Sequence, residues 1–121
     1  MGKALIRTNN RSVRLEGGVS DGDWIVVAAG ENQILTFSLT TGEEKGHFFG
    51  IAPLVVAAAG VVAVERDAKE LDLYDLNTQQ LRSRYVFSDP IATKEVSGDG
   101  KRLLVLTNTQ TVYLFNISGS N

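Results

Sequence analysis

Few residues of this sequence could carry out acid–base, nucleophilic or metal chemistry. His47 is the single histidine and there is no cysteine, so a Ser-His-Asp triad could be built only on His47, and a multi-histidine or thiolate metal site within one chain is excluded. No pair of carboxylates is set apart by its spacing for acid–base work. The sequence therefore predicts no catalytic residue, no metal site and no cofactor, and we expect a protein that is not an enzyme.

The aspartates are concentrated where turns are expected. A carboxylate in a turn commonly accepts hydrogen bonds from the local backbone, and Asp tolerates the left-handed conformation that many turns need. This turn chemistry accounts for Asp21, Asp23, Asp67, Asp89 and Asp99.

Basic residues gather in two short segments, one near the N-terminus and one at residues 82–84. We interpret both as solvent-facing edge strands whose charges disfavour pairing with another chain. In the second segment Arg82 and Arg84 alternate, as solvent-facing residues of a strand do. The N-terminal segment contains four basic residues and a single acid, Glu16; the basic residues are Lys3, Arg7, Arg11 and Arg14. The alternative interpretation of this segment is a patch that binds an acidic partner.

Net charge and hydropathy argue against nucleic-acid and membrane partners. The formal charge is −2, from 12 basic and 14 acidic residues, so no positive field would attract a polyanion. The most apolar run, residues 54–64 (LVVAAAGVVAV), is far shorter than the roughly 20 residues of a membrane helix. Gly60 suggests a turn between two fully covered strands. Without a signal segment at the N-terminus, we expect a cytoplasmic protein.

Three further features have ordinary explanations. Trp24 begins an expected strand, where packing in the core or along a central channel is favoured over stacking on a ligand. Gly17 and Gly18 do not lead into a helix and so do not form a phosphate loop. The segments Asn10-Arg-Ser12 and Asn116-Ile-Ser118 match glycosylation acceptors, which we attribute to chance.

An internal repeat of about 39 residues organises the chain. Residues 19–27 (VSDGDWIVV) align with residues 96–105 (VSGDGKRLLV), and 34–39 (ILTFSL) with 112–117 (VYLFNI). A middle copy, 71–76 (LDLYDL), places Tyr74 between Phe37 and Phe115. Short β-branched and aromatic segments alternate with turn residues in every copy, which predicts an antiparallel all-β fold with almost no helix.

The repeat predicts the strands individually. We expect turns between consecutive strands at the Asp-Gly pairs 21–22 and 99–100 and at Gly60. The expected strands are 13–19, 24–29, 33–39 and 44–49 in the first copy, 53–58, 61–66, 70–76 and 81–87 in the second, and 91–97, 102–107 and 111–117 in the third.

These residues resemble the WD-repeat and related bacterial β-propeller families. Residues 96–105 look like the family's first turn and second strand, and residues 37–42, 74–78 and 115–118 look like the end of its third strand. No copy has the Trp-Asp pair, and Gly46-His47 lies too early for the family's Gly-His element, so a looser propeller family fits equally well. The resemblance implies four-stranded antiparallel blades over 13–50, 51–90 and 91–118, with the third one strand short and a spare outer strand at 3–8.

The resemblance also bears on assembly and function. Known propellers commonly complete their last blade with a strand from the other end of the chain, and a closed ring needs about 4–8 blades. We therefore expect a homodimer whose two three-blade units close a six-bladed ring, unless the chain is a terminal piece of a longer propeller or a designed protein without a native ligand. The expected function is a non-catalytic scaffold for proteins or peptides. The alternative is a ligand-binding or hydrolytic propeller with its site at the mouth of the central channel.

Overall fold

A computed structural model describes residues 15–117 of the chain, and within them it contains strands, turns and a single turn of 3-10 helix. The first sheet consists of β1 (Leu15–Asp21), β2 (Trp24–Ala29), β3 (Gln33–Ser38) and β4 (Glu44–Phe49). The second consists of β5 (Ile51–Val56), β6 (Val61–Asp67), β7 (Glu70–Asp75) and β8 (Leu81–Val86). The third consists of β9 (Ile91–Val96), β10 (Arg102–Thr107) and β11 (Val112–Asn116).

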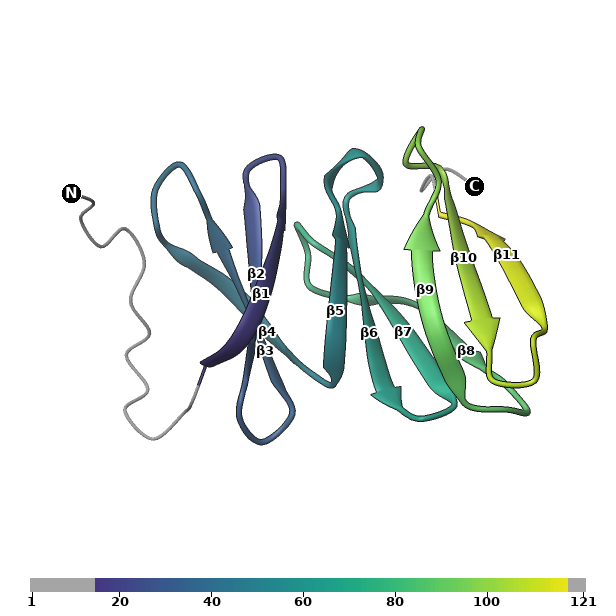
Figure 1. The fold of residues 1–121 in the computed structure, drawn as a ribbon. Coiled ribbons are helices and arrows are strands. Elements are labelled where there is room, and N and C mark those ends of the chain that lie inside the picture. The colour runs from purple at the N-terminus through teal and green to yellow at the C-terminus, as the bar shows by residue number, and fades with distance from the viewer. Residues whose placement is uncertain (1–14, 118–121) are drawn as a thin grey trace.

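Each sheet is an antiparallel meander whose strands lie in chain order, and the three sheets stand one beside the next (Figure 1). Two sheets have four strands and the third has three, in the order β9-β10-β11. This confirms the predicted all-β blades, with the third blade one strand short among the described residues. The spare strand expected at 3–8 lies outside the described residues.

Most strand boundaries follow the prediction, and two strands are shifted by two residues. β1 extends to Asp21, which pairs directly with Trp24, because Gly22 adopts the left-handed conformation (φ 58°) and closes a tight hairpin. β5 begins at 51 and ends at Val56, because the connection to β6 is a 3-10 turn (Ala57–Ala59) that ends on Gly60 at φ 68°. Side-chain alternation alone does not reveal such turn geometry.

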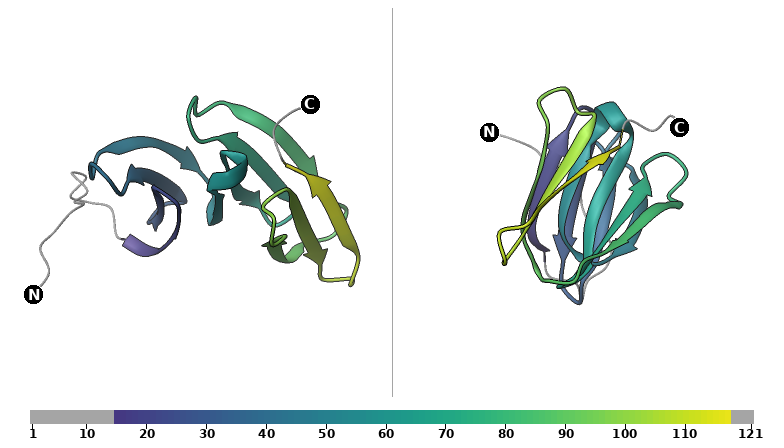
Figure 2. Two further views of the ribbon diagram at one scale, coloured as in Figure 1. Left: turned by 90° about the horizontal axis from the view of Figure 1, so that it is seen from above. Right: turned by 90° about the vertical axis from the view of Figure 1, so that its right-hand side faces the viewer.

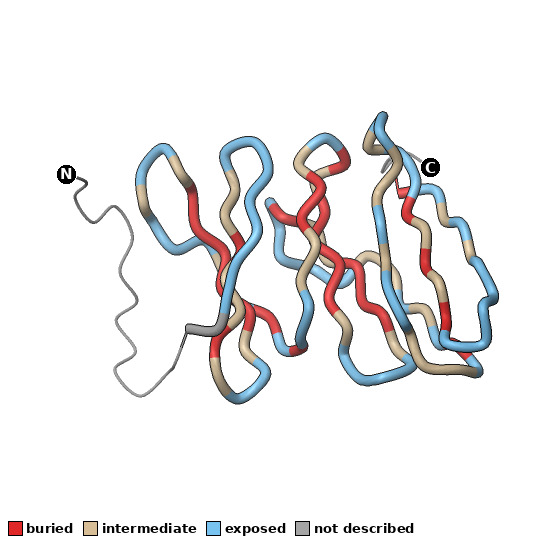
Figure 3. The backbone as a smooth tube through the Cα atoms, viewed as in Figure 1, coloured by how far each residue is buried: buried red, intermediate tan, exposed pale blue. Residues whose placement is uncertain are grey.

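Neighbouring sheets face one another, as the view from above shows (Figure 2), and buried residues, red in Figure 3, lie mainly on the inner strands of each sheet. Two apolar clusters fill the interfaces between the sheets. Alternation along each strand directs one set of side chains toward the preceding sheet and the other set toward the following one. Between the first and second sheets lie Val26, Ile34, Phe48, Val55, Val62, Val64 and Leu76. Between the second and third lie Val61, Ala63, Leu71, Leu73, Leu103 and Val105, with Tyr85, Phe87, Tyr113 and Phe115 around them.

The second half of the run 54–64 is covered on both faces, as predicted, whereas in the first half Ala58 is exposed. Val61, Val62 and Val64 are completely shielded from solvent, and Ala63 is 1% exposed. β6 lies in the interior of the middle sheet, so both of its faces are covered by neighbouring sheets. Trp24 is half-buried against the first of the two clusters, which confirms its predicted packing role.

Candidate functional site

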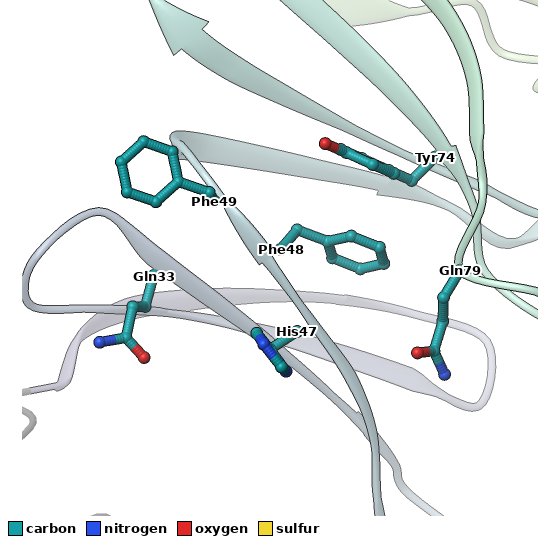
Figure 4. Close-up of a pocket in the computed structure, with 6 residues that line it drawn as sticks. All are labelled: Gln33, His47, Phe48, Phe49, Tyr74 and Gln79. Atoms are coloured by element: carbon teal, nitrogen blue, oxygen red, sulfur yellow. The ribbon is translucent and has the colours of Figure 1, made fainter.

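A pocket of about 460 Å³ lies where the outer part of the first sheet meets the second sheet (Figure 4). Gln33 opens β3, the consecutive residues His47, Phe48 and Phe49 end β4, and the second sheet contributes from β7 and from the turn after it. The pocket is therefore a product of two sheets, and only their packing brings its walls together. Its lining residues are Gln33, His47, Phe48, Phe49, Tyr74 and Gln79.

Two aromatic rings form the rigid wall of this pocket. Phe48 is 6% exposed, and its ring lies 4.4 Å from that of Tyr74, centroid to centroid, with 32° between the planes. Alternation along β4 directs His47 and Phe49 to the opposite side of the strand, where Phe49 remains 59% exposed. The pocket thus combines a buried aromatic pair with an accessible third ring.

The hydroxyl of Tyr74 is held by an ion pair whose carboxylate is buried. It donates a hydrogen bond to Asp72 Oδ2 (3.3 Å), and Arg84 donates to both oxygens of that carboxylate at 2.7 and 3.1 Å. Asp72 is completely shielded from solvent. Burial raises the pKa of the Tyr74 phenol, and the neighbouring Asp72 charge raises it further. The phenol is therefore a neutral hydroxyl at physiological pH.

This ion pair adds a partner to an arginine that was expected to face solvent. Arg84 is exposed, as expected, and pairs with Asp72 at 2.7 Å, whereas Arg82 is half-buried and pairs with Asp75 at 2.7 Å. Sequence reasoning missed Asp72 as the partner of Arg84, although the alternation of 71–76 places Asp72 and Tyr74 on one face of the strand. It also missed Glu65 and Lys94, whose 2.6 Å ion pair joins the second and third sheets with little exposure to solvent.

Gln79 fixes the mouth of the pocket to β4. Its side-chain amide donates to the backbone carbonyl of Lys45, linking the turn after β7 to the neighbouring sheet. A Cβ atom at residue 46 would meet this amide, so the flexible end of the Gln79 side chain would have to move aside for any larger residue.

The lining of the pocket is mostly aromatic and amide in character. It contains three aromatic rings, two amides and one imidazole, and no carboxylate, hydroxymethyl or ammonium group. His47 lies on the outer strand of the first sheet, as predicted, and the phenol of Tyr74 is the other titratable group among the pocket-lining residues. Aromatic faces with neutral hydrogen-bonding groups suit an uncharged segment with apolar side chains.

A second hollow, of about 390 Å³, lies among the tips of the hairpins β1-β2, β5-β6 and β9-β10. Its lining is largely small and apolar, with two carboxylates. Asp21 accepts from the backbone N–H of Ala57 (2.8 Å), and Asp99 accepts from Ser97 Oγ (2.6 Å) and the Lys101 N–H (3.0 Å). The Ser97 hydrogen bond, followed by the Lys101 one, holds the pKa of Asp99 below its usual value.

The carboxylates of this second hollow are thus occupied in fixing hairpins. No group of three His, Cys, Asp or Glu residues that could hold a metal occurs within residues 15–117. The turn prediction is correct for Asp67 and Asp99, which bond to the backbone two residues on. It is incomplete for Asp21, which bonds to the next sheet, and for Asp89, which bonds to the Thr109 hydroxyl of another turn.

Several sequence features receive no structural test. Lys3, Arg7, Arg11, Arg14 and the acceptor segment 10–12 lie outside the described residues. In the part of the chain that the structure describes, there is no helix long and apolar enough to cross a membrane.

The fold is similar to that of solved β-propellers. No family model and no curated protein matches the sequence. The C-terminal WD40 domain of Sif2 matches with a TM-score of 0.67 and 14% identity, over 84% of this chain and 31% of that one. BamB from Moraxella catarrhalis matches with a TM-score of 0.68 and 13% identity, over 85% and 31%. The sheets are thus WD40-like propeller blades, and the chain spans 31% of the length of either structure.

Proposed function

We propose that the chain is a non-catalytic β-propeller scaffold that binds an uncharged peptide segment of a protein partner and assembles as a homodimer through blade–blade contacts. The peptide would lie in the pocket between the first two sheets. The observation that carries this proposal is the chemistry of the lining, in which aromatic rings and amides occur together without a carboxylate, ammonium or guanidinium group.

The second hollow supports a scaffold over a hydrolytic or ion-binding propeller. A site for such chemistry would present free carboxylates or amides where the hairpin tips converge. Asp21 and Asp99 instead accept hydrogen bonds from the backbone of the hairpins themselves. Their geometry is explained by the fold, so no second function is favoured by a specific observation.

A peptide library tests the binding proposal. Random linear peptides displayed on phage are selected on the immobilised protein, and an enriched peptide is resynthesised to measure its dissociation constant. We expect enriched peptides to be uncharged and to contain apolar or aromatic side chains. Phe49→Ala should weaken their binding by about 10-fold or more, because exposed aromatic anchors dominate such contacts.

Val86 provides a matched control for Phe49. It occupies the equivalent last position of β8, is 68% exposed, and does not line the pocket. Val86→Ala should change the dissociation constant by less than about twofold, the ordinary effect of a surface substitution away from a site. Selection of acidic or basic peptides, or equal binding to the Phe49→Ala protein, would overturn the proposed site.

A further inference from the structure

One face of the third sheet is exposed at positions that are buried in the other two sheets. The registers of β2-β3, β6-β7 and β10-β11 make three positions in each sheet equivalent. In the first two sheets the side chains at these positions are at most 1% exposed, whereas Val112 and Leu114 are each 56% exposed and Leu104 is half-buried. The equivalent sets are Val26, Ile34 and Thr36; Ala63, Leu71 and Leu73; and Leu104, Val112 and Leu114.

The equivalent side chains of the first two sheets are less exposed because a neighbouring sheet covers them. Val26 and Ile34 pack against the second sheet, and Leu71 and Leu73 pack against the third. The corresponding surface of the third sheet, which we call the outward face, consists of Leu104, Leu106, Val112 and Leu114. Among the described residues no sheet covers this face and no strand pairs with the outer edge of β11.

We propose that the outward face of the third sheet is a docking surface for the first sheet of a second copy of this chain. This inference rests on the assembly part of the proposed function and names the surfaces that meet. An exposed sheet face with aliphatic side chains on adjacent strands is a typical association site. Its apolar positions match those at two interfaces already formed within the chain, so the expected occupant is another blade.

The first sheet carries the other half of such an interface. Where a sheet receives its predecessor, the contacts come from alternate residues of its second and third strands, as with Val62, Val64 and Tyr74 or with Leu103 and Val105. The equivalent residues of the first sheet are Ile25, Val27, Leu35 and Phe37, which form an apolar cluster with Ala29. Leu35 and Phe37 are already shielded within one chain, so most of the new burial would fall on the third sheet.

Two copies joined in this way make head-to-tail contacts, which produce a closed assembly when the rotation between them permits it. The peptide pocket would stay accessible in that assembly. Val86, the equivalent of Phe49, is 68% exposed although its sheet is packed against a neighbour. Blade packing therefore does not bury this outer position.

The mass in solution tests the proposal. Light scattering during size exclusion should give about twice the 13.1 kDa of one chain. Leu114→Arg and Val112→Arg each place a charge on the outward face and should shift the mass to that of one chain. Val86→Arg, at an equally exposed apolar position outside this face, should leave the mass unchanged. Circular dichroism checks that each variant retains its β-sheet spectrum.

Cross-linking separates the possible occupants, because the chain has no cysteine of its own. Chains with Leu114→Cys and chains with Val27→Cys, mixed with a short bismaleimide, should form a cross-linked pair. Cross-linking among Leu114→Cys chains alone would show that two outward faces meet each other, which overturns the head-to-tail contact. A wild-type mass of one chain at every concentration overturns the docking proposal altogether. Peptide binding is measured separately, so its failure is distinguishable from a failure of assembly.

Discussion

Asp72 is a buried carboxylate that is hydrogen-bonded to two neighbouring side chains. It is fully buried and accepts two hydrogen bonds from Arg84 and one from Tyr74. Removal of one partner from a buried ion pair leaves the other charge uncompensated, which costs about 3–5 kcal/mol in fully buried cases. The Arg84 side chain is 38% exposed, so its guanidinium can turn partly to water.

We therefore expect Asp72→Ala to lower the free energy of unfolding by about 2–3 kcal/mol, measured by urea denaturation. The control is the double variant Asp72→Leu with Arg84→His, which copies the paired residues Leu35 and His47 of the first sheet. It should recover much of the loss, because no buried charge is then left without a partner. An unfolding free energy for Asp72→Ala within about 0.5 kcal/mol of wild type would contradict this account.

Asp23 and Asp99 are expected to make the stability depend on acid pH. Hydrogen bonds from Thr40 and Ser38 hold the pKa of Asp23 below its usual value, as those from Ser97 and Lys101 do for Asp99. The folded pKa is thus lower than the unfolded one, near 4. The stabilisation is complete above the unfolded pKa and is lost as the pH falls through the folded pKa.

Replacement of these carboxylates should therefore flatten the acid limb of the stability profile. With Asp23→Asn or Asp99→Asn, the free energy of unfolding should fall less steeply between about pH 4 and pH 2 than in the wild type. Urea titrations at a series of pH values measure the slope. Ser97→Ala removes the largest contribution to the shift at Asp99 and should act in the same direction. Identical slopes in all four proteins would rule out this origin.

The residue scale shows where sequence reasoning succeeds and where it stops. The Asp67 and Asp99 bonds connect neighbours in the chain, so residue type and local spacing predict them. The Asp72–Arg84 pair depends on the register of β7 against β8, which shifts between Leu73 and Tyr74. The Asp21–Ala57 bond depends on the docking of two sheets. Neither the register shift nor the docking has a local signal.

At the scale of the hairpins, glycine conformation and hairpin contact can be separated experimentally. Gly22 combines a left-handed backbone (φ 58°) with a close approach, since a Cβ there would lie 3.0 Å from the Cβ of Ala57. Gly60 has a similar backbone (φ 68°) and open space around it. Gly98 has open space without the left-handed backbone. Gly22 thus combines the left-handed backbone with the close contact, Gly60 has the left-handed backbone alone, and Gly98 has neither.

Alanine at these positions should lower stability in that order. We expect losses of about 2 kcal/mol for Gly22→Ala and about 1 kcal/mol for Gly60→Ala, and no loss or a gain of about 0.5 kcal/mol for Gly98→Ala. Thermal and urea unfolding give the differences. Equal losses at residues 22 and 60 would mean that the Ala57 contact contributes nothing beyond the backbone conformation.

The repeat allowed nine of the eleven strands to be placed within one residue at each end. Turns with Asp-Gly or Asn-Thr separate the alternating apolar segments and so mark the strand ends. β1 and β5 are the exceptions, and both adjoin the hairpin tips where the sheets touch. The continuous apolar run 54–64, which lacks alternation, also predicted strands covered on both faces, as residues 61–64 show. The pocket could not be predicted, because Phe48 and Tyr74 meet only when two sheets pack.

At the scale of the whole molecule, each sheet depends on its neighbours alone, as in other repeat proteins. Phe48 packs only where the first and second sheets meet, and Phe87 only where the second and third meet. Phe48→Ala should therefore accelerate backbone hydrogen exchange in β2 and β3 more than in β10 and β11. Phe87→Ala should do the reverse, since its ring lies 5.0 Å from that of Tyr113.

Exchange measured by mass spectrometry on peptides from each sheet distinguishes the two patterns. Each substitution removes a large buried ring, with an expected loss of about 3 kcal/mol in the free energy of unfolding. Uniform acceleration across all three sheets by both variants would show a single cooperative unit and contradict the neighbour dependence.

Tryptophan and tyrosine fluorescence report on different interfaces of this protein. Trp24 is the only tryptophan, and it packs with Tyr74 in the cluster between the first two sheets. The other two tyrosines, Tyr85 and Tyr113, lie at the second interface. Indole emission should therefore register the parting of the first and second sheets and remain nearly silent when the third detaches. A loss of tyrosine emission intensity without an indole shift would identify events at the far sheet, with no label added to the chain.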